Sequence, residues 1–186
     1  MQLDSPSQFS KTTLTLHWIV AITVISLLAV GIYMDETGTH SLYPWHKSFG
    51  FVIFFVILAR VIWRIKNGWP VPVSQYQSWE TLLAKVVHYV LIFGTILMPL
   101  SGFLMSAYGG SGVDVFGIEV VARNIDPENP MKSMPHNKAI ASFAHETHGL
   151  VGYTLVGAVI LHIAGALKHH LIDKDGTLRR MLGSSV

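Results

Sequence analysis

The chain has 186 residues, of which 51% are hydrophobic and only 13% are charged, and its mean hydropathy is +0.45. This balance excludes an ordinary soluble domain of this length and favours an integral membrane protein. The chain contains no cysteine, which excludes disulfides, iron–sulfur clusters and covalent cofactor attachment through a C-x-x-C-H motif. Its ten histidines are therefore the strong soft-metal ligands that remain.

Four apolar stretches are long enough to cross a bilayer, which takes about 20 residues of helix. They cover residues 14–34, 44–65, 82–108 and 139–168. The first lacks a small-residue cleavage site, so we interpret it as a true span and not as a removable signal. Pro99, with Gly94 and Gly102 nearby, predicts a kink in the third span. We expect an all-α integral membrane protein, a four-transmembrane-helix bundle formed by a single domain over residues 1–186.

The distribution of charge predicts the direction of the four spans. Nine lysines and arginines and four acidic residues lie on the side of the termini and the second loop, for a net charge of +5. The other side has four basic and seven acidic residues, for a net charge of −3. Because cytoplasmic loops carry the excess of lysine and arginine, we expect both termini in the cytoplasm.

Two histidines in the fourth span, His148 and His162, are separated by fourteen residues. A helix turns about 100° per residue, so fourteen residues bring a side chain back to within roughly 40° of its starting direction and move it about 21 Å along the axis. The two imidazoles therefore share one face of the helix, one near each membrane surface. They are too far apart to bind one ion, so as ligands they would serve two centres.

Two further histidines lie at matching depths in the predicted topology. His17 begins the first span on the inner side, like His162, and His46 begins the second span on the outer side, like His148. A small residue follows each of the four at i+4 and leaves space for a flat ligand against the helix: Ala21, Gly50, Gly152 and Ala166. The pairs His17/His162 and His46/His148 thus predict two sites with two axial imidazoles each, a ligand set that suits haem iron.

Other interpretations of these histidines are open at this point. A histidine in a membrane helix also forms hydrogen bonds across helix interfaces, although ionisable groups at this depth are usually functional. A zinc or di-iron site would need carboxylates or cysteines close by, and only Glu146 qualifies within the spans. His88 is the main rival to His17, ranked second because Ile92 and not a small residue follows at i+4. His145 lies about 260° around the helix from His162 and faces elsewhere.

Four motifs carry a resemblance to a known family. They are Leu16-His17-Trp18, His46-Lys47-Ser48-Phe49-Gly50, Met98-Pro99-Leu100-Ser101-Gly102, and His148 and His162 followed by Ala166-Leu167-Lys168-His169-His170. Over nearly its whole length the chain resembles the bacterial cytochrome b561 family, relatives of the di-haem cytochrome b subunits of nickel–iron hydrogenases and formate dehydrogenases. The resemblance implies a bacterial inner-membrane bundle that encloses two b haems, each held by two histidines, and exchanges electrons with quinone. One similar type of member oxidises superoxide at the outer face and reduces ubiquinone.

Three further residues are candidates for cofactor contacts. Arg60 and Arg64, one turn apart on the inner half of the second span, suit the anionic propionates of a haem, although positive-inside anchoring also places arginines here. His169 lies two turns after His162, and the resemblance suggests a quinone site for it. The outer loop, residues 109–138, is longer than in the short-loop members of the family.

The sequence therefore favours electron transfer between the outer face, by way of two haems, and a quinone near His169, with the direction unassigned. One reading is a self-contained oxidoreductase that takes electrons from superoxide to ubiquinone or another quinone. A second is an electron-transfer or anchor subunit for a dehydrogenase, a cytochrome or a periplasmic redox protein. A third is a histidine-lined transporter without haem. The expected partners are membrane lipid, quinone and a periplasmic protein or small-molecule donor, with no nucleic acid.

Overall fold

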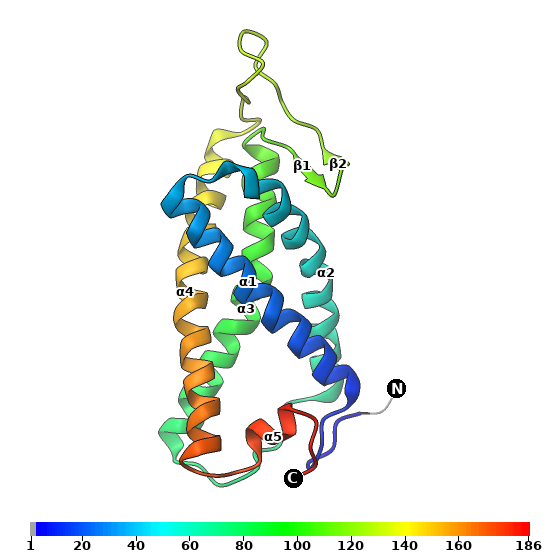
Figure 1. Cartoon of the computed structure of the whole chain (residues 1–186), viewed down its shortest axis with the longest axis vertical. Coiled ribbons are helices and arrows are strands. Elements are labelled where there is room, and N and C mark those ends of the chain that lie inside the picture. The colour runs from blue at the N-terminus through cyan, green and yellow to red at the C-terminus, as the bar shows by residue number, and fades with distance from the viewer. Residues whose placement is uncertain (1–2) are drawn as a thin grey trace.

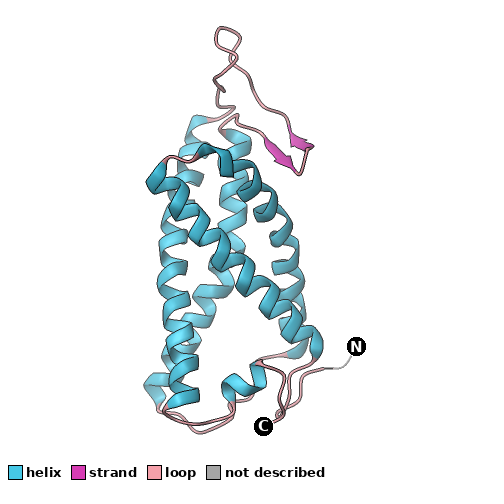
Figure 2. Cartoon of the chain, in the orientation of Figure 1, coloured by secondary structure: helices cyan, strands magenta, loops and turns pink. Residues whose placement is uncertain are grey.

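The computed structural model describes residues 3–186. Four long helices run along the molecule (Figure 1): α1 (Lys11–Thr37), α2 (Tyr43–Asn67), α3 (Ser78–Tyr108) and α4 (Lys138–Leu171). All four are long and apolar enough to cross a membrane. The short elements are η1 (His40–Leu42), α5 (Thr177–Met181) and the antiparallel strands β1 (Val113–Val115) and β2 (Ile118–Val121). The predicted four-helix bundle is confirmed, with a small hairpin added in the outer loop (Figure 2).

The helices extend a few residues beyond the predicted spans because polar caps continue them past the apolar segments. The Ser10 side chain accepts a hydrogen bond from Thr13 N at the start of α1, and Asn137 accepts one from Ile140 N at the start of α4. Gln77 begins α3 with a reciprocal capping box. A hydropathy profile detects only the apolar part of a helix, so the spans predicted from it end before these polar caps.

The bundle packs mainly as α3 along α4 and α1 along α2, and α1 runs diagonally across the other helices (Figure 1). The described N-terminal segment, which begins at residue 3, and the C-terminus lie at the end where α2 connects to α3, and the long loop lies at the opposite end. We call these the inner and the outer end, after the predicted topology. Gly94 on α3 allows the close approach of α4, since a Cβ atom there would lie 2.7 Å from Leu155 Cδ2. Small residues at such contacts are typical of membrane helix pairs.

The distribution of apolar side chains is that of a protein surrounded by lipid. Among residues 3–186, the large side chains that are fully buried are those of Ile57 and Leu155, whereas Ile22, Ile62 and Phe93 are 62%, 67% and 66% exposed. Exposed apolar surface on this scale would favour aggregation in water. On a membrane-spanning bundle it contacts acyl chains, which are as apolar as the side chains themselves.

Asp4 ties the N-terminal segment to α1 and α2. Its Oδ1 accepts hydrogen bonds from Ser10 N (3.0 Å), Ser10 Oγ (2.8 Å) and Thr13 Oγ1 (2.7 Å), and its Oδ2 lies 3.4 Å from Arg64. Burial alone would raise the pKa of Asp4, but these hydrogen bonds and the guanidinium outweigh it and hold the pKa below its ordinary value.

Replacing Asp4 with asparagine is expected to lower the free energy of unfolding by about 1–2 kcal/mol at pH 7, a value that allows for the partial exposure of the group. Because the pKa of Asp4 is depressed in the folded protein, its contribution is complete above the unfolded pKa of about 4 and is lost as the pH falls through the folded pKa. Thermal unfolding in detergent should show the difference between the two proteins shrinking on acidification. A difference that stays constant from pH 7 to pH 3 would contradict the role given to the carboxylate.

Candidate functional site

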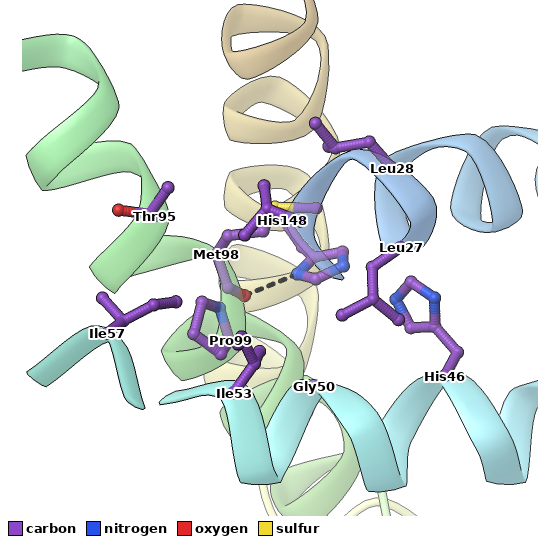
Figure 3. Close-up of a pocket in the computed structure, with 11 residues that line it drawn as sticks. Leu27, Leu28, His46, Gly50, Ile53, Ile57, Thr95, Met98, Pro99 and His148 are labelled. Atoms are coloured by element: carbon purple, nitrogen blue, oxygen red, sulfur yellow. Dashed lines mark hydrogen bonds between the residues drawn. The ribbon is translucent and has the colours of Figure 1, made fainter. Parts of the chain in front are cut away.

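The outer ends of α2 and α4 bring His46 and His148 to opposite walls of one pocket (Figure 3). Their ring centroids are 6.3 Å apart and the ring planes are inclined by 78°. The rest of the pocket is lined by apolar and small residues: Val24, Leu27, Leu28, Gly50, Ile53, Ile57, Thr95, Met98 and Pro99. The two imidazoles are therefore the groups best suited to bind a metal in a largely apolar cavity.

The His148 ring is fixed by α3. Its Nδ1 lies 2.9 Å from the Met98 carbonyl oxygen (Figure 3). The same Nδ1 lies 3.2 Å from Ser101 Oγ. A carbonyl only accepts, so Nδ1 carries the proton and Nε2 keeps a lone pair for a metal. Gly102 provides the space for this ring, because a Cβ atom there would lie 2.9 Å from His148 Cε1. In metal-ligating histidines, the ring nitrogen that does not bind the metal usually donates a hydrogen bond of this kind.

His46 is packed in a similar way but without a polar support. Gly31 of α1 lies against it, since a Cβ atom there would be 3.4 Å from His46 Cε1. Its Nδ1 is buried and has no hydrogen-bond partner within residues 3–186. A buried polar atom without a partner is unfavourable in an apolar pocket. Coordination of a metal by Nδ1 itself would satisfy this atom.

The inner pair lies nearer the termini, where α1 and α4 bring His17 within 6.3 Å of His162, centroid to centroid, at an interplanar angle of 54°. His88 of α3 joins the same cluster, with its ring centroid 5.3 Å from that of His162. The Trp69 ring also packs against His88, with the two centroids 6.2 Å apart. The structure thus brings together the predicted pair, His17 and His162, and also His88, the second candidate for the inner ligand.

The geometry of both pairs fits iron held between two imidazoles. Two rings that ligate one metal from opposite sides, with bonds of about 2 Å, have centroids about 6 Å apart. His46/His148 and His17/His162 both meet this spacing at 6.3 Å, whereas His88 and His162 are closer. Two neutral nitrogen ligands without a carboxylate suit haem better than zinc or di-iron.

The two arginine candidates have different surroundings. Arg64 is paired with Asp4. Arg60 forms no hydrogen bond or ion pair among the described residues, and it lies within electrostatic range of His17, His88 and His162. A half-buried guanidinium without a carboxylate requires an anion to compensate it. Arg60 is therefore the better placed of the two for a propionate.

His169 lies beyond the inner pair, among acidic residues at the end of α4. Its Nδ1 is 2.9 Å from Asp173 Oδ2 and 3.2 Å from Asp175 Oδ2, and the Tyr76 ring packs against it at 4.6 Å. Three ligand atoms of this group lie within 4.8 Å of one another. Lys168 already supplies a cation there, with its Nζ 2.9 Å from Asp173 Oδ2, so the group is satisfied without a metal ion.

His145 does not join either pair. Its Nδ1 lies 3.1 Å from Met105 Sδ in an open cleft between the outer ends of α3 and α4, as the helical-wheel argument predicted. Sequence reasoning missed the α3 residues that position His148, namely Met98, Ser101 and Gly102, although all three belong to a motif that it singled out. Pro99 beside them was the available signal of an irregular helix at this point.

Comparison with known proteins identifies the family of the chain. The family model described as prokaryotic cytochrome b561 matches residues 8–184. Cytochrome b561 homolog 2 and homolog 1 of Escherichia coli (strain K12) are 31% and 30% identical to the chain. These alignments cover 98% and 95% of this chain and 95% and 97% of the relatives. A Yersinia pestis protein named probable superoxide oxidase CybB is 26% identical over 94% of this chain and 96% of its own length. The chain therefore belongs to the prokaryotic cytochrome b561 family, multi-pass membrane proteins that transfer electrons and whose name implies b-type haem.

Proposed function

We propose that the chain binds two b haems, one between His46 and His148 and one between His17 and His162, and carries electrons between the outer face of the inner membrane and the quinone pool. The observation that carries this proposal is the equal 6.3 Å spacing of two histidine pairs at two levels of α4. When bound, haem supplies reversible one-electron chemistry, and the protein supplies position and environment.

At the outer site the chain orients its ligands before any cofactor enters. The Met98 carbonyl holds His148 in the tautomer that presents Nε2 to the pocket. The apolar lining excludes water, and together with hydrogen bonding to the ligands it is one of the factors that set a haem potential. Gly50 leaves space in the pocket wall beside His46. A Cβ atom at this position would have no neighbouring atom within 4 Å.

At the inner site Arg60 offers its positive charge to a propionate, and His169 faces the quinone. Because Asp173 and Asp175 both approach Nδ1 of His169, its Nε2 is left for a quinone carbonyl oxygen. Reduction of a quinone takes up protons as well as electrons, and an imidazole is a side chain that can pass a proton to a carbonyl oxygen. The excess of lysine and arginine at this end supports its assignment to the cytoplasm.

A pair of alanine variants separates the two candidates for the inner ligand. His17→Ala is expected to lose one of two haems, because His88 is too close to His162 to replace it on the opposite side of an iron. His88→Ala, the matched control in the same cluster, should retain both. The haem content per chain of the purified variants measures the outcome. Full loading of His17→Ala with loss in His88→Ala would transfer the role to His88.

Two donors compete for the outer site. Superoxide is suggested by the name of the Yersinia pestis relative. A cationic redox protein, with this chain as its electron-transfer or anchor subunit, is favoured by the net charge of −3 on the outer side, which repels an anionic donor.

A superoxide pulse onto the oxidised protein in vesicles that contain ubiquinone distinguishes the donors. If superoxide is the donor, the haems should be reduced rapidly and then reoxidised by quinone. When superoxide dismutase is present, the haems should stay oxidised. Haems that stay oxidised under the pulse would contradict superoxide as the donor and leave the protein partner.

A further inference from the structure

The turn of the outer hairpin has an unusual residue in an unusual conformation. Val115 pairs with Ile118, so the loop between β1 and β2 consists of Phe116 and Gly117 alone. Both have positive φ angles, 51° and 88°. Such two-residue turns favour asparagine and glycine, and a bulky residue in the left-handed region is strained. The chain nevertheless places a phenylalanine at this position.

The turn is fixed against the first turns of α2. The Phe116 ring lies 5.2 Å from that of Phe49 and 6.1 Å from that of Trp45, centroid to centroid. Phe116 N donates a hydrogen bond of 3.1 Å to Ser48 Oγ, and Ser48 is only 2% exposed. In Figure 1 the hairpin turn points back along the bundle, beside the outer end of α2. Phe116 is thus directed toward the helix and not toward open water.

This aromatic cluster is exposed and continuous with the lipid-facing side of α2. Trp45, Phe49 and Phe116 are 59%, 46% and 50% exposed. Val52, three residues after Phe49, continues the same side of the helix into the span and is 45% exposed. Tryptophan near the end of a membrane span marks the level of the lipid headgroups. Phe116 packs against Phe49, which lies one helical turn deeper in the span than Trp45.

Next to its turn, the hairpin has one apolar and one acidic face. Cross-strand pairs alternate between the two faces of a hairpin. Val115 pairs with Ile118, which is 70% exposed, and the neighbouring pair on the other face is Asp114 with Glu119. The hairpin is therefore amphipathic although it has only two strands.

We propose that the hairpin turn inserts into the leaflet at this end of the bundle, where Phe116 and Ile118 contact lipid at the boundary of headgroups and acyl chains while Asp114 and Glu119 face water. Lipid is the occupant because the patch is continuous with the side of α2 that lipid already covers. The insertion anchors the start of the outer loop, where Ser111 Oγ and the Gly112 carbonyl oxygen accept hydrogen bonds from Lys47 (3.0 and 3.2 Å), one residue after His46.

The absence of cysteine in the chain allows a direct test. Phe116→Cys, Ile118→Cys and the matched control Glu119→Cys each carry one nitroxide label on the full chain, reconstituted in vesicles of phosphatidylethanolamine and phosphatidylglycerol. Collision rates with oxygen, which concentrates in lipid, and with a water-soluble nickel chelate are measured by electron paramagnetic resonance. Circular dichroism confirms that each variant retains the helical fold.

The proposal predicts an oxygen-to-nickel collision ratio several-fold higher at positions 116 and 118 than at 119. Equal ratios at the three positions would overturn it, because the hairpin would then lie in water. Labels at 116 and 118 that neither reagent reaches would also overturn it, since a protein surface and not lipid would then cover the patch. None of these outcomes depends on haem or quinone.

Discussion

Replacing His148 with alanine is expected to leave the purified protein with one haem in place of two. The variant removes one of the two histidines proposed to hold the outer haem, and no other histidine is within ring-contact distance of His46 in the part of the chain that the structure describes. The inner pair, fourteen residues away along α4, keeps both of its ligands. Haem content per chain and a redox titration that loses one of two components measure the effect.

His145→Ala is the matched control for this variant. It removes an imidazole three residues earlier on the same helix, where the ring contacts Met105 in an open cleft. Two haems in this control together with one in His148→Ala is the predicted pattern. Two haems in both variants would contradict the outer pair.

A second large effect is expected at a glycine on a different helix. Gly102→Ala places a Cβ atom 2.9 Å from His148 Cε1 and 3.2 Å from His148 Nδ1. The ring cannot retreat without breaking its bond to the Met98 carbonyl, so its Nε2 is turned away from His46. We expect most of the outer haem to be lost on purification and the inner haem to be retained, as read from the haem content.

Gly157→Ala controls for the change of helix propensity. A Cβ atom at Gly157 of α4 meets nothing within 4 Å. Alanine favours a helix over glycine by about 1 kcal/mol at either position, so both variants share this gain and differ only in the clash. A Gly102→Ala protein with the same haem content as Gly157→Ala would show that the space beside His148 is not required.

The helices were predictable because membrane spans are long and uniformly apolar. Their ends were not, since Ser10, Gln77 and Asn137 extend the helices through polar caps that hydropathy does not detect. The hairpin at 113–121 was missed because its two strands are only three and four residues long. Gly117 between alternating valine and isoleucine was the one local signal of a turn.

The histidine pairs were predictable because helical spacing and depth are fixed by sequence and topology. The rotation of α3 about its own axis is not fixed by spacing and depth, and this rotation decides which side chains of α3 reach the pairs. That rotation brings His88 to His162 and Gly102 to His148. The pairing of Arg64 with Asp4 likewise depends on the course of the N-terminal segment, which has no periodic pattern.

We propose that the two histidine pairs each hold one b haem. The most direct measurement is the number of haems per chain in the purified wild-type protein, determined by the pyridine haemochrome method together with electron paramagnetic resonance of the oxidised form. We expect two b haems per chain, both low-spin with two imidazole ligands. A preparation without a b-type absorption band, or fully folded protein with a single haem per chain, would contradict it.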